Sequence, residues 1–183
     1  MSSDSRSRQR PEIAPAIAPL IGGIVVSCQA TEDNPLHGPE MMATMARAAE
    51  IGGAVGLRVN GPEDTRAVMA ATSLPVLAIN KVDYDGFDVR ITPTVADTLA
   101  VVKTGAPFIA IDGTNRPRPQ GENLADSVRA IHEHGALAFA DLATRDDLEG
   151  AIAAGVDAVG TTLSGYTAES ATDRSEEHTS ELQ

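Results

Sequence analysis

The sequence predicts an α/β protein of the (β/α)8 TIM-barrel type, incomplete, with about six of the eight βα units present. Short aliphatic runs alternate with alanine-rich amphipathic segments. The runs are apolar along their whole length, as expected for parallel strands covered on both faces. Nearly every run ends in a polar residue, and barrel enzymes build their active sites at the carboxyl ends of the strands. An open doubly wound sheet is the alternative, but the first run lacks the glycine-rich loop that opens a dinucleotide-binding sheet.

The predicted strands are too short to be helices and are rich in β-branched or small residues. They cover residues 22–29, 53–60, 74–81, 106–114, 135–143 and 156–162. Amphipathic segments between them, such as 38–52, 94–105 and 145–155, predict helices. The last of these places Leu148, Ile152 and Ala153 at helical spacing after an acidic first turn. Glycines that precede the next strand predict helix C-caps, namely Gly53, Gly105, Gly135 and Gly155.

Composition limits the classes of partner. The 183 residues suit one domain, and 42% of them are hydrophobic, as in a globular protein. A net charge of −12 argues against nucleic acid or an anionic membrane as a partner, whereas one local arginine is enough to hold a small anionic substrate. The single cysteine, Cys28, excludes an intrachain disulfide and fits a cytoplasmic protein. No apolar run approaches the roughly 18 residues of a membrane span.

The two ends of the chain are expected to lie outside the catalytic domain. Residues 1–19 are charged without a following apolar core, which predicts a disordered extension and not a secretory signal. From residue 174 the sequence reads "RSEEHTSELQ", which matches the conceptual translation of a common sequencing-library adapter. We therefore expect residues 174–183 to be a non-native tail and residues 20–173 to form the partial barrel.

The strand ends supply the candidate site residues, which are Gln29, Arg58, Lys81, Asp112, Asp141 and Thr161. Lys81 follows the aliphatic run "LPVLAIN" and is the most informative of them. A lysine at a strand end either reaches solvent or presents a basic amine to a substrate. The second role requires a pKa below the ordinary value of about 10.4, which desolvation or a nearby positive charge such as that of Arg58 would produce. The residues alone leave both roles open.

Several motifs together resemble the bacterial N-acetylmannosamine-6-phosphate 2-epimerases. These motifs are "SCQA", "GAVGLR", "NKVDY", "IAIDGTNRPRP" and "GTTLSGYT", and the resemblance covers about residues 20–168. It implies a (β/α)8 barrel that interconverts N-acetylmannosamine 6-phosphate and N-acetylglucosamine 6-phosphate by proton transfer at C2, in the breakdown of sialic acid. It also implies that no organic cofactor is needed, and it leaves open a homodimer of the complete protein.

The resemblance assigns a role to each of four strand-end residues. Lys81 in "NKVDY" is expected to be the catalytic base. Arg58 should hold sugar hydroxyls or a carbonyl oxygen, with a salt bridge at the strand end as its alternative. Gln29 should hydrogen-bond the substrate, or else cap the following loop. Asp141 in "FADLA" should orient the sugar and help to balance the charge of Lys81, or else form a structural ion pair in the barrel.

The remaining polar candidates are expected to be structural. We predict that Asp112 organises its loop together with Asn115 and Arg116. Cys28 is predicted to be a small buried hydrophobic residue, because no histidine accompanies it. The histidines at 37, 132 and 134 do not have the spacing of a metal site, so no metal is expected.

The sequence departs from the family in one respect. The family places a second catalytic group, a glutamate in an "AEG"-type motif, on strand seven, and grips phosphate with a glycine-rich loop after strand eight. Neither motif occurs here, and Glu169 in "YTAES" is not that glutamate. We therefore expect this chain to be inactive and poorly stable, with two unpaired strand edges. The alternatives are a Schiff-base aldolase, which also uses a strand-end lysine, and a non-catalytic sugar-phosphate-binding fragment.

Overall fold

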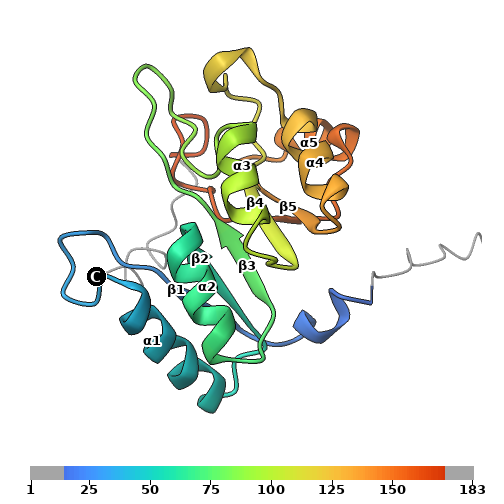
Figure 1. The fold of residues 1–183 in the computed structure, drawn as a ribbon. Coiled ribbons are helices and arrows are strands. Elements are labelled where there is room, and N and C mark those ends of the chain that lie inside the picture. Colours follow the sequence, from blue (N-terminus) through green and yellow to red (C-terminus); the bar gives the residue numbers. More distant parts are fainter. Residues whose placement is uncertain (1–14, 172–183) are drawn as a thin grey trace, which may run out of the picture.

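In the computed structural model, which describes residues 15–171, the chain forms one six-stranded sheet (Figure 1). Each strand pairs in parallel with the next strand in the sequence, so that the spatial order is β1-β2-β3-β4-β5-β6. The strands are β1 (Val25–Cys28), β2 (Gly56–Asn60), β3 (Val76–Ile79), β4 (Phe108–Asp112), β5 (Leu137–Asp141) and β6 (Ala158–Gly160). All six predicted strands are confirmed, each shorter than the run that predicted it.

The strand order distinguishes the two architectures that the sequence left in competition. A doubly wound sheet reverses its strand order at a switch point, whereas a barrel wall adds each strand beside the previous one. The order here runs from β1 to β6 without reversal. Six parallel strands alternating with helices therefore form a half-barrel, and the barrel-type prediction is confirmed.

Helices connect the strands. They are α1 (Pro39–Ile51), α2 (Pro62–Ala71), α3 (Val95–Val102), α4 (Leu124–Glu133) and α5 (Asp147–Ala154), with short 3-10 helices η1 (Ala18–Leu20) and η2 (Pro119–Gly121). The helices predicted within 38–52, 94–105 and 145–155 are confirmed as α1, α3 and α5. The sequence analysis did not single out α2, although Pro62 at its first position and an acidic first turn are typical start signals. The four glycines predicted as C-caps all have positive φ, and Gly155 ends α5 in the left-handed conformation.

Alternate strand residues face opposite sides of the sheet. In β2, Leu57 and Val59 are buried in a hydrophobic cluster with Met42 of α1 and Val68 of α2. The intervening residue, Arg58, faces the inner side of the half-barrel, where it helps to line a cavity of about 210 Å³. The same alternation places the chemistry-bearing side chains of the other strands on this inner side.

The half-barrel is open at both of its edges. Within the described residues, β1 pairs only with β2 and β6 pairs only with β5, as expected for an incomplete barrel. In α5, which confirms the helix predicted at 145–155, Ala151 is fully buried whereas Ile152 is 65% exposed. Among the described residues no helix follows β6, so nothing packs on this side of α5, and Val159 is 42% exposed for the same reason.

The two terminal segments predicted from sequence lie mainly outside the described residues. Residues 174–183, the predicted non-native tail, and residues 1–14 of the predicted extension are outside the described residues. The described part of that extension enters η1, just before β1. No helix among residues 15–171 is both long and apolar enough to cross a membrane.

Candidate active site

The centre of the candidate site is an ion pair between Arg58 of β2 and Asp141, the last residue of β5. The guanidinium donates two hydrogen bonds to the carboxylate, from Nη1 to Oδ1 at 3.0 Å and from Nη2 to Oδ2 at 2.6 Å. The Asp141 side chain is fully buried and that of Arg58 is 13% exposed. The pair crosses the inner side of the half-barrel and joins strands that are not neighbours. Arg58 and Asp141 thus form the ion pair that was predicted as the alternative to substrate binding for each of them.

A third side chain, that of Thr162, completes this cluster. Its hydroxyl donates to Oδ1 of Asp141 at 2.6 Å. The sequence analysis placed Thr161 at this strand end, one residue too early. A side chain at position 160 would point at the ring of Phe139 on the inner side, so alternation directs residue 162 inward as well. Which of Thr161 and Thr162 faces inward depends on the register of β6 beside β5, and the run "VDAVGTT" does not show that register.

Lys81 lies two residues beyond β3, at the rim of the half-barrel. Its backbone N–H donates to Oδ1 of Asn60, the last residue of β2, at 2.8 Å. The pKa of its amine is lowered, first because partial burial disfavours the charged form and then because of the positive charges of Arg58 and Arg90. Asp141 acts in the opposite direction and raises it. The expected influence of Arg58 on this lysine is therefore present, although the side chain remains exposed to solvent.

Gln29 follows β1 at the same end of the sheet. Its Nε2 donates to Oγ of Ser27 at 2.6 Å. Its Oε1 is buried and has no hydrogen-bond partner among the described residues. An acceptor of this kind is available to a hydroxyl or amide of a small molecule.

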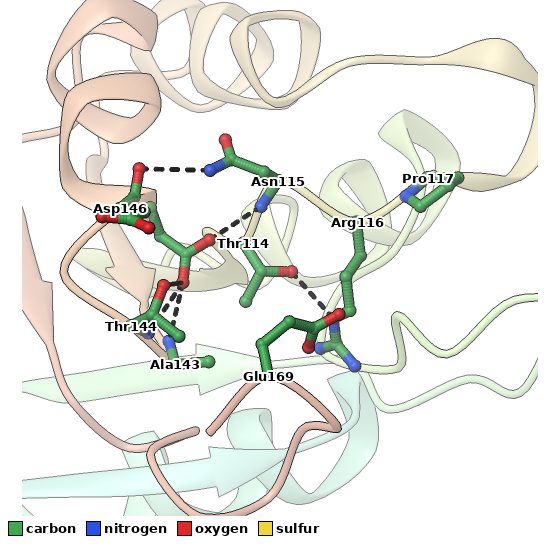
Figure 2. A pocket seen from close by; sticks show the side chains of 9 residues that line it. Thr114, Asn115, Arg116, Pro117, Ala143, Thr144, Asp146 and Glu169 are labelled. Atoms are coloured by element: carbon green, nitrogen blue, oxygen red, sulfur yellow. Dashed lines mark hydrogen bonds between the residues drawn. The ribbon is translucent and has the colours of Figure 1, made fainter. Parts of the chain in front are cut away.

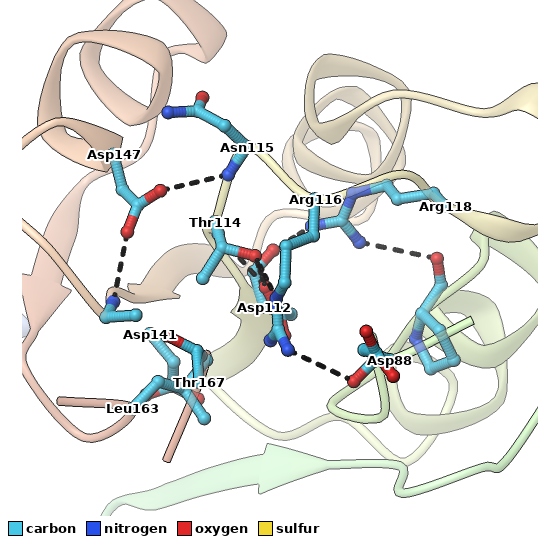
Figure 3. Close-up of polar contacts among 12 residues, drawn as sticks. Asp88, Asp112, Thr114, Asn115, Arg116, Arg118, Asp141, Asp147, Leu163 and Thr167 are labelled. Atoms are coloured by element: carbon cyan, nitrogen blue, oxygen red, sulfur yellow. Dashed lines mark hydrogen bonds and ion pairs between the residues drawn. The ribbon is translucent and has the colours of Figure 1, made fainter. Parts of the chain in front are cut away.

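Asp112 organises its own loop, as predicted (Figure 3). Its buried carboxylate accepts a hydrogen bond from Nη2 of Arg116 at 2.7 Å, and two from the hydroxyl and backbone N–H of Thr114. The contact with Arg116 is the expected one, and Thr114 was missed. Asn115, the other residue predicted to organise this loop, donates from its backbone N–H to Asp147 at 3.0 Å. The sharp turn after Asp112 directs Asn115 towards α5.

A larger cavity of about 390 Å³ lies between the β4–α4 and β5–α5 loops (Figure 2). Neither Lys81 nor Arg58 lines it. Asp147, on its wall, already accepts hydrogen bonds from the backbone N–H groups of Asn115, Ala143 and Thr144. These contacts fix the two loops to each other.

The other candidates are structural. Cys28 is fully buried against Met42 and Val59, and burial raises the pKa of its thiol, so it is the small hydrophobic residue that was predicted. His132 contacts Asp157, whereas His37 and His134 contact backbone carbonyls. Within residues 15–171 no group of three or more His, Cys, Asp or Glu side chains is arranged to hold a metal ion.

Fold and site together define a barrel-type protein with a basic amine and a buried arginine–carboxylate pair at the carboxyl ends of its strands. The family model described as "Putative N-acetylmannosamine-6-phosphate epimerase" matches residues 42–180. The chain belongs to this family.

Individual relatives agree with this assignment. The chain is 47% identical over 146 residues to a sequence from Clostridioides difficile described as "Putative N-acetylmannosamine-6-phosphate 2-epimerase", a match that spans 80% of this chain and 66% of the relative. It is 44% identical over 159 residues to one from Listeria innocua, with 86% and 69% covered. The solved 2-epimerase from Clostridium perfringens superposes with a TM-score of 0.83 at 41% identity, over 88% of this chain and 71% of that one. The chain thus spans about two thirds of the length of these relatives.

More distant solved structures show the fold alone. A deoxyribose-phosphate aldolase from Coccidioides immitis superposes with a TM-score of 0.56 at 18% identity, over 85% of this chain and 68% of that one. A mandelate oxidase variant superposes with a TM-score of 0.52 at 20% identity, over 81% and 51%. At such identities a shared architecture does not transfer chemistry.

The lowered pKa of Lys81 predicts a pH dependence of stability. In the folded state this pKa lies below its ordinary value of about 10.4, which the unfolded chain retains. Between the two values the unfolded chain binds more protons, so the free energy of unfolding should increase with pH in this window. Below the lowered pKa both the folded and the unfolded chain carry the proton, so the titration of Lys81 no longer makes the free energy of unfolding change with pH.

The measurement compares the native chain with the Lys81→Met variant by urea unfolding, from about pH 7 to pH 10.5, the range that includes the ordinary lysine pKa. The native chain should gain stability relative to the variant as the pH rises. Groups such as Cys28 titrate in both proteins and cancel in the difference. Parallel pH profiles would contradict a desolvated Lys81.

Proposed function

We propose that this chain provides the first six βα units of an N-acetylmannosamine-6-phosphate 2-epimerase, which interconverts that sugar with N-acetylglucosamine 6-phosphate in amino-sugar catabolism. The proposal depends on one observation: Lys81 lies just beyond the carboxyl end of β3, and the positive charge of Arg58 is one cause of the lowered pKa of its amine. The proposed partner is therefore a small sugar phosphate. Membership of the family supports this substrate class.

The chemistry requires a base near C2 of the open-chain sugar and a donor near the adjacent carbonyl. The proton at C2 is weakly acidic, so its removal is fast only when the enolate oxygen that forms is stabilised. Lys81 supplies the base, because its lowered pKa raises the fraction of free amine near neutral pH.

Arg58 supplies the donor. Two of its N–H groups bind Asp141, which fixes the plane of the guanidinium. Its other N–H groups are available to a carbonyl or hydroxyl oxygen. In this role Asp141 orients Arg58 and limits the charge around Lys81. The unpartnered Oε1 of Gln29 would accept a hydrogen bond from the sugar.

The return of the proton from the opposite face of C2 needs a second group. The family resemblance assigns it to a glutamate on strand seven and assigns phosphate binding to a loop after strand eight, and neither motif occurs in this sequence. The matched part makes up 66% of the Clostridioides difficile relative, so about a third of that relative lies outside the match. We therefore assign turnover to the complete barrel and expect no measurable epimerisation by the 183-residue chain alone.

The test joins residues 1–162 of this chain to the C-terminal third of the Clostridioides difficile relative. Incubation with N-acetylmannosamine 6-phosphate in D2O should give N-acetylglucosamine 6-phosphate with deuterium at C2, measured by ¹H NMR. A soluble, folded chimera that neither exchanges nor epimerises would overturn the proposal. Trapping of substrate on Lys81 by borohydride would instead indicate Schiff-base chemistry.

A further inference from the structure

The segment that carries Lys81 is held from both sides by one buried carboxylate, that of Asp97 in the first turn of α3. Oδ1 of Asp97 accepts a hydrogen bond from Nδ2 of Asn80 at 3.1 Å, and Oδ2 accepts one from the hydroxyl of Tyr84, also at 3.1 Å. Asn80 directly precedes Lys81, and Tyr84 follows it by three residues. The lysine therefore lies on a short length of chain whose two ends are fixed to the same side chain.

Asp97 is itself rigidly placed. It is 8% exposed, and the hydroxyl of Thr94, the N-cap of α3, donates to its Oδ2 at 2.6 Å. The same hydroxyl accepts a hydrogen bond from the backbone N–H of Asp97 at 3.1 Å. A negative side chain in the first turn is also favoured by the helix dipole. Helix α3 thus serves as a fixed base for the carboxylate.

The main chain around Lys81 has further anchors. The backbone N–H of Asn80 donates to Oγ1 of Thr92 at 3.1 Å, and the backbone N–H of Thr92 donates back to the carbonyl of Asn80 at 2.8 Å. The backbone N–H of Lys81 is bound by Asn60. Thr92 is fully buried and has a φ of 48°, an uncommon conformation for a β-branched residue that only firm surroundings maintain. The hydrogen bonds of Asn80 and Thr92 therefore favour one fixed position for the main chain at Lys81.

Asp97 has no direct role in the candidate site. It does not line the inner cavity, and its charge is not among the causes of the lowered Lys81 pKa. Its hydrogen bonds to Asn80 and Tyr84 instead hold the chain on either side of Lys81. That position decides both how far the amine is desolvated and how close it lies to Arg58.

We propose that Asp97 is a positioning residue, which holds Lys81 at the rim of the half-barrel by binding Asn80 and Tyr84. The inference rests on the proposed function, in which Lys81 moves the proton. The positioning role can be tested without turnover, because it predicts a change in the pKa of the Lys81 amine.

The chain offers an unusually direct test, since Lys81 and Lys103 are its only lysines. Lys103 is exposed at the end of α3 and provides an internal reference. Trace labelling of the 183-residue chain with isotopic acetic anhydride, over a series of pH values, gives the reactivity of each amine by mass spectrometry. The ratio of Lys81 to Lys103 reports the free-amine fraction of Lys81.

Asp97→Asn leaves only one acceptor oxygen for the two donors of Asn80 and Tyr84, which should loosen the segment, so that Lys81 becomes more solvated and moves away from Arg58. The Lys81 labelling profile should then shift to higher pH, and its ratio to Lys103 near pH 8 should fall about three- to tenfold, because a higher pKa lowers the fraction of free amine. Loss of the Asp97 charge alone would act in the opposite direction, because removing a nearby negative charge favours the free amine. Tyr84→Phe deletes a single hydrogen bond and should cause a smaller shift of the same sign, even if Asp97→Asn does not fold.

Asp147→Asn is the matched control. Asp147 is likewise a buried first-turn carboxylate, of α5, and it accepts hydrogen bonds from the loops beside it but none from the Lys81 segment. Its substitution should lower the melting temperature and leave the Lys81 labelling profile unchanged.

The outcomes separate the two proposals. An unchanged Lys81 profile in a folded Asp97→Asn or Tyr84→Phe protein overturns the positioning role, whatever the chimera does. An equal shift in Asp147→Asn also overturns it, because general loosening would then explain the result. A specific shift, combined with exchange that does not need Lys81, would support positioning and contradict the proposed function.

Discussion

Replacing Lys81 with methionine in the chimera is expected to lower the rate of deuterium incorporation at C2 by about 10²- to 10⁴-fold, the usual contribution of a positioned general base. Methionine keeps much of the aliphatic length of lysine but cannot accept a proton. The barrel should remain folded, because the Lys81 side chain is exposed and none of its side-chain atoms forms a described hydrogen bond. The loss should therefore appear in kcat, with KM changed much less.

Two further variants test this interpretation. Lys81→Arg retains the positive charge but stays protonated at all relevant pH values, so it should be as inactive as the methionine variant. Lys103→Met removes the other lysine that this chain contributes to the chimera and should leave exchange unchanged. If Lys81→Arg retained more than about a tenth of the activity, a loss smaller than general base catalysis supplies, Lys81 would be a binding residue and not the base.

Asp141→Ala is expected to destabilise the chain by about 3–5 kcal/mol, because it leaves the guanidinium of Arg58 partly buried without its partner. The variant also loses the hydrogen bond from Thr162. A domain is usually stable by only about 5–15 kcal/mol, so much of the protein should be unfolded before any denaturant is added. Urea unfolding followed by circular dichroism measures the change.

An exposed ion pair provides the control for that experiment. Asp83 and Arg90 bind each other with side chains that are 72% and 60% exposed, so Asp83→Ala should cost about 0–1 kcal/mol. The double variant Arg58→Met/Asp141→Leu removes both buried charges and should recover much of the lost stability. A cost for Asp141→Ala as small as that for Asp83→Ala would show that the Arg58–Asp141 pair is not desolvated.

Much of the fold could be predicted because it depends on local pattern. Each strand is a short run rich in apolar β-branched or small residues, and every helix except α2 ends near a glycine with positive φ. The exposure of Ile152 could not be predicted, because helical spacing identifies an apolar face but not whether another element covers it. Helix α2 was not singled out because its apolar face is narrow. Of its ten residues only Thr65 and Val68 are fully buried, and one of these two is polar.

The candidate site was predictable only in part. Parallel strands bring their carboxyl ends to one rim, so the sequence could assign Arg58, Lys81 and Asp141 to the same region. It could not choose Thr162 over Thr161, because that choice depends on the register in which β6 pairs with β5. Nor could it distinguish an arginine that holds a substrate from one that binds a carboxylate 83 positions away.

By itself, the sequence determined the family, the barrel-type order of strands and helices, and the position of Lys81 at a strand end, since these follow from the order of side chains along the chain. Only the tertiary structure decided which side chains meet: Arg58 with Asp141, and Asp97 with both flanks of the Lys81 segment. The reason is physical. Hydrogen bonds and ion pairs act over a few ångströms in space, and the curvature of the sheet sets those distances between residues that are far apart in sequence.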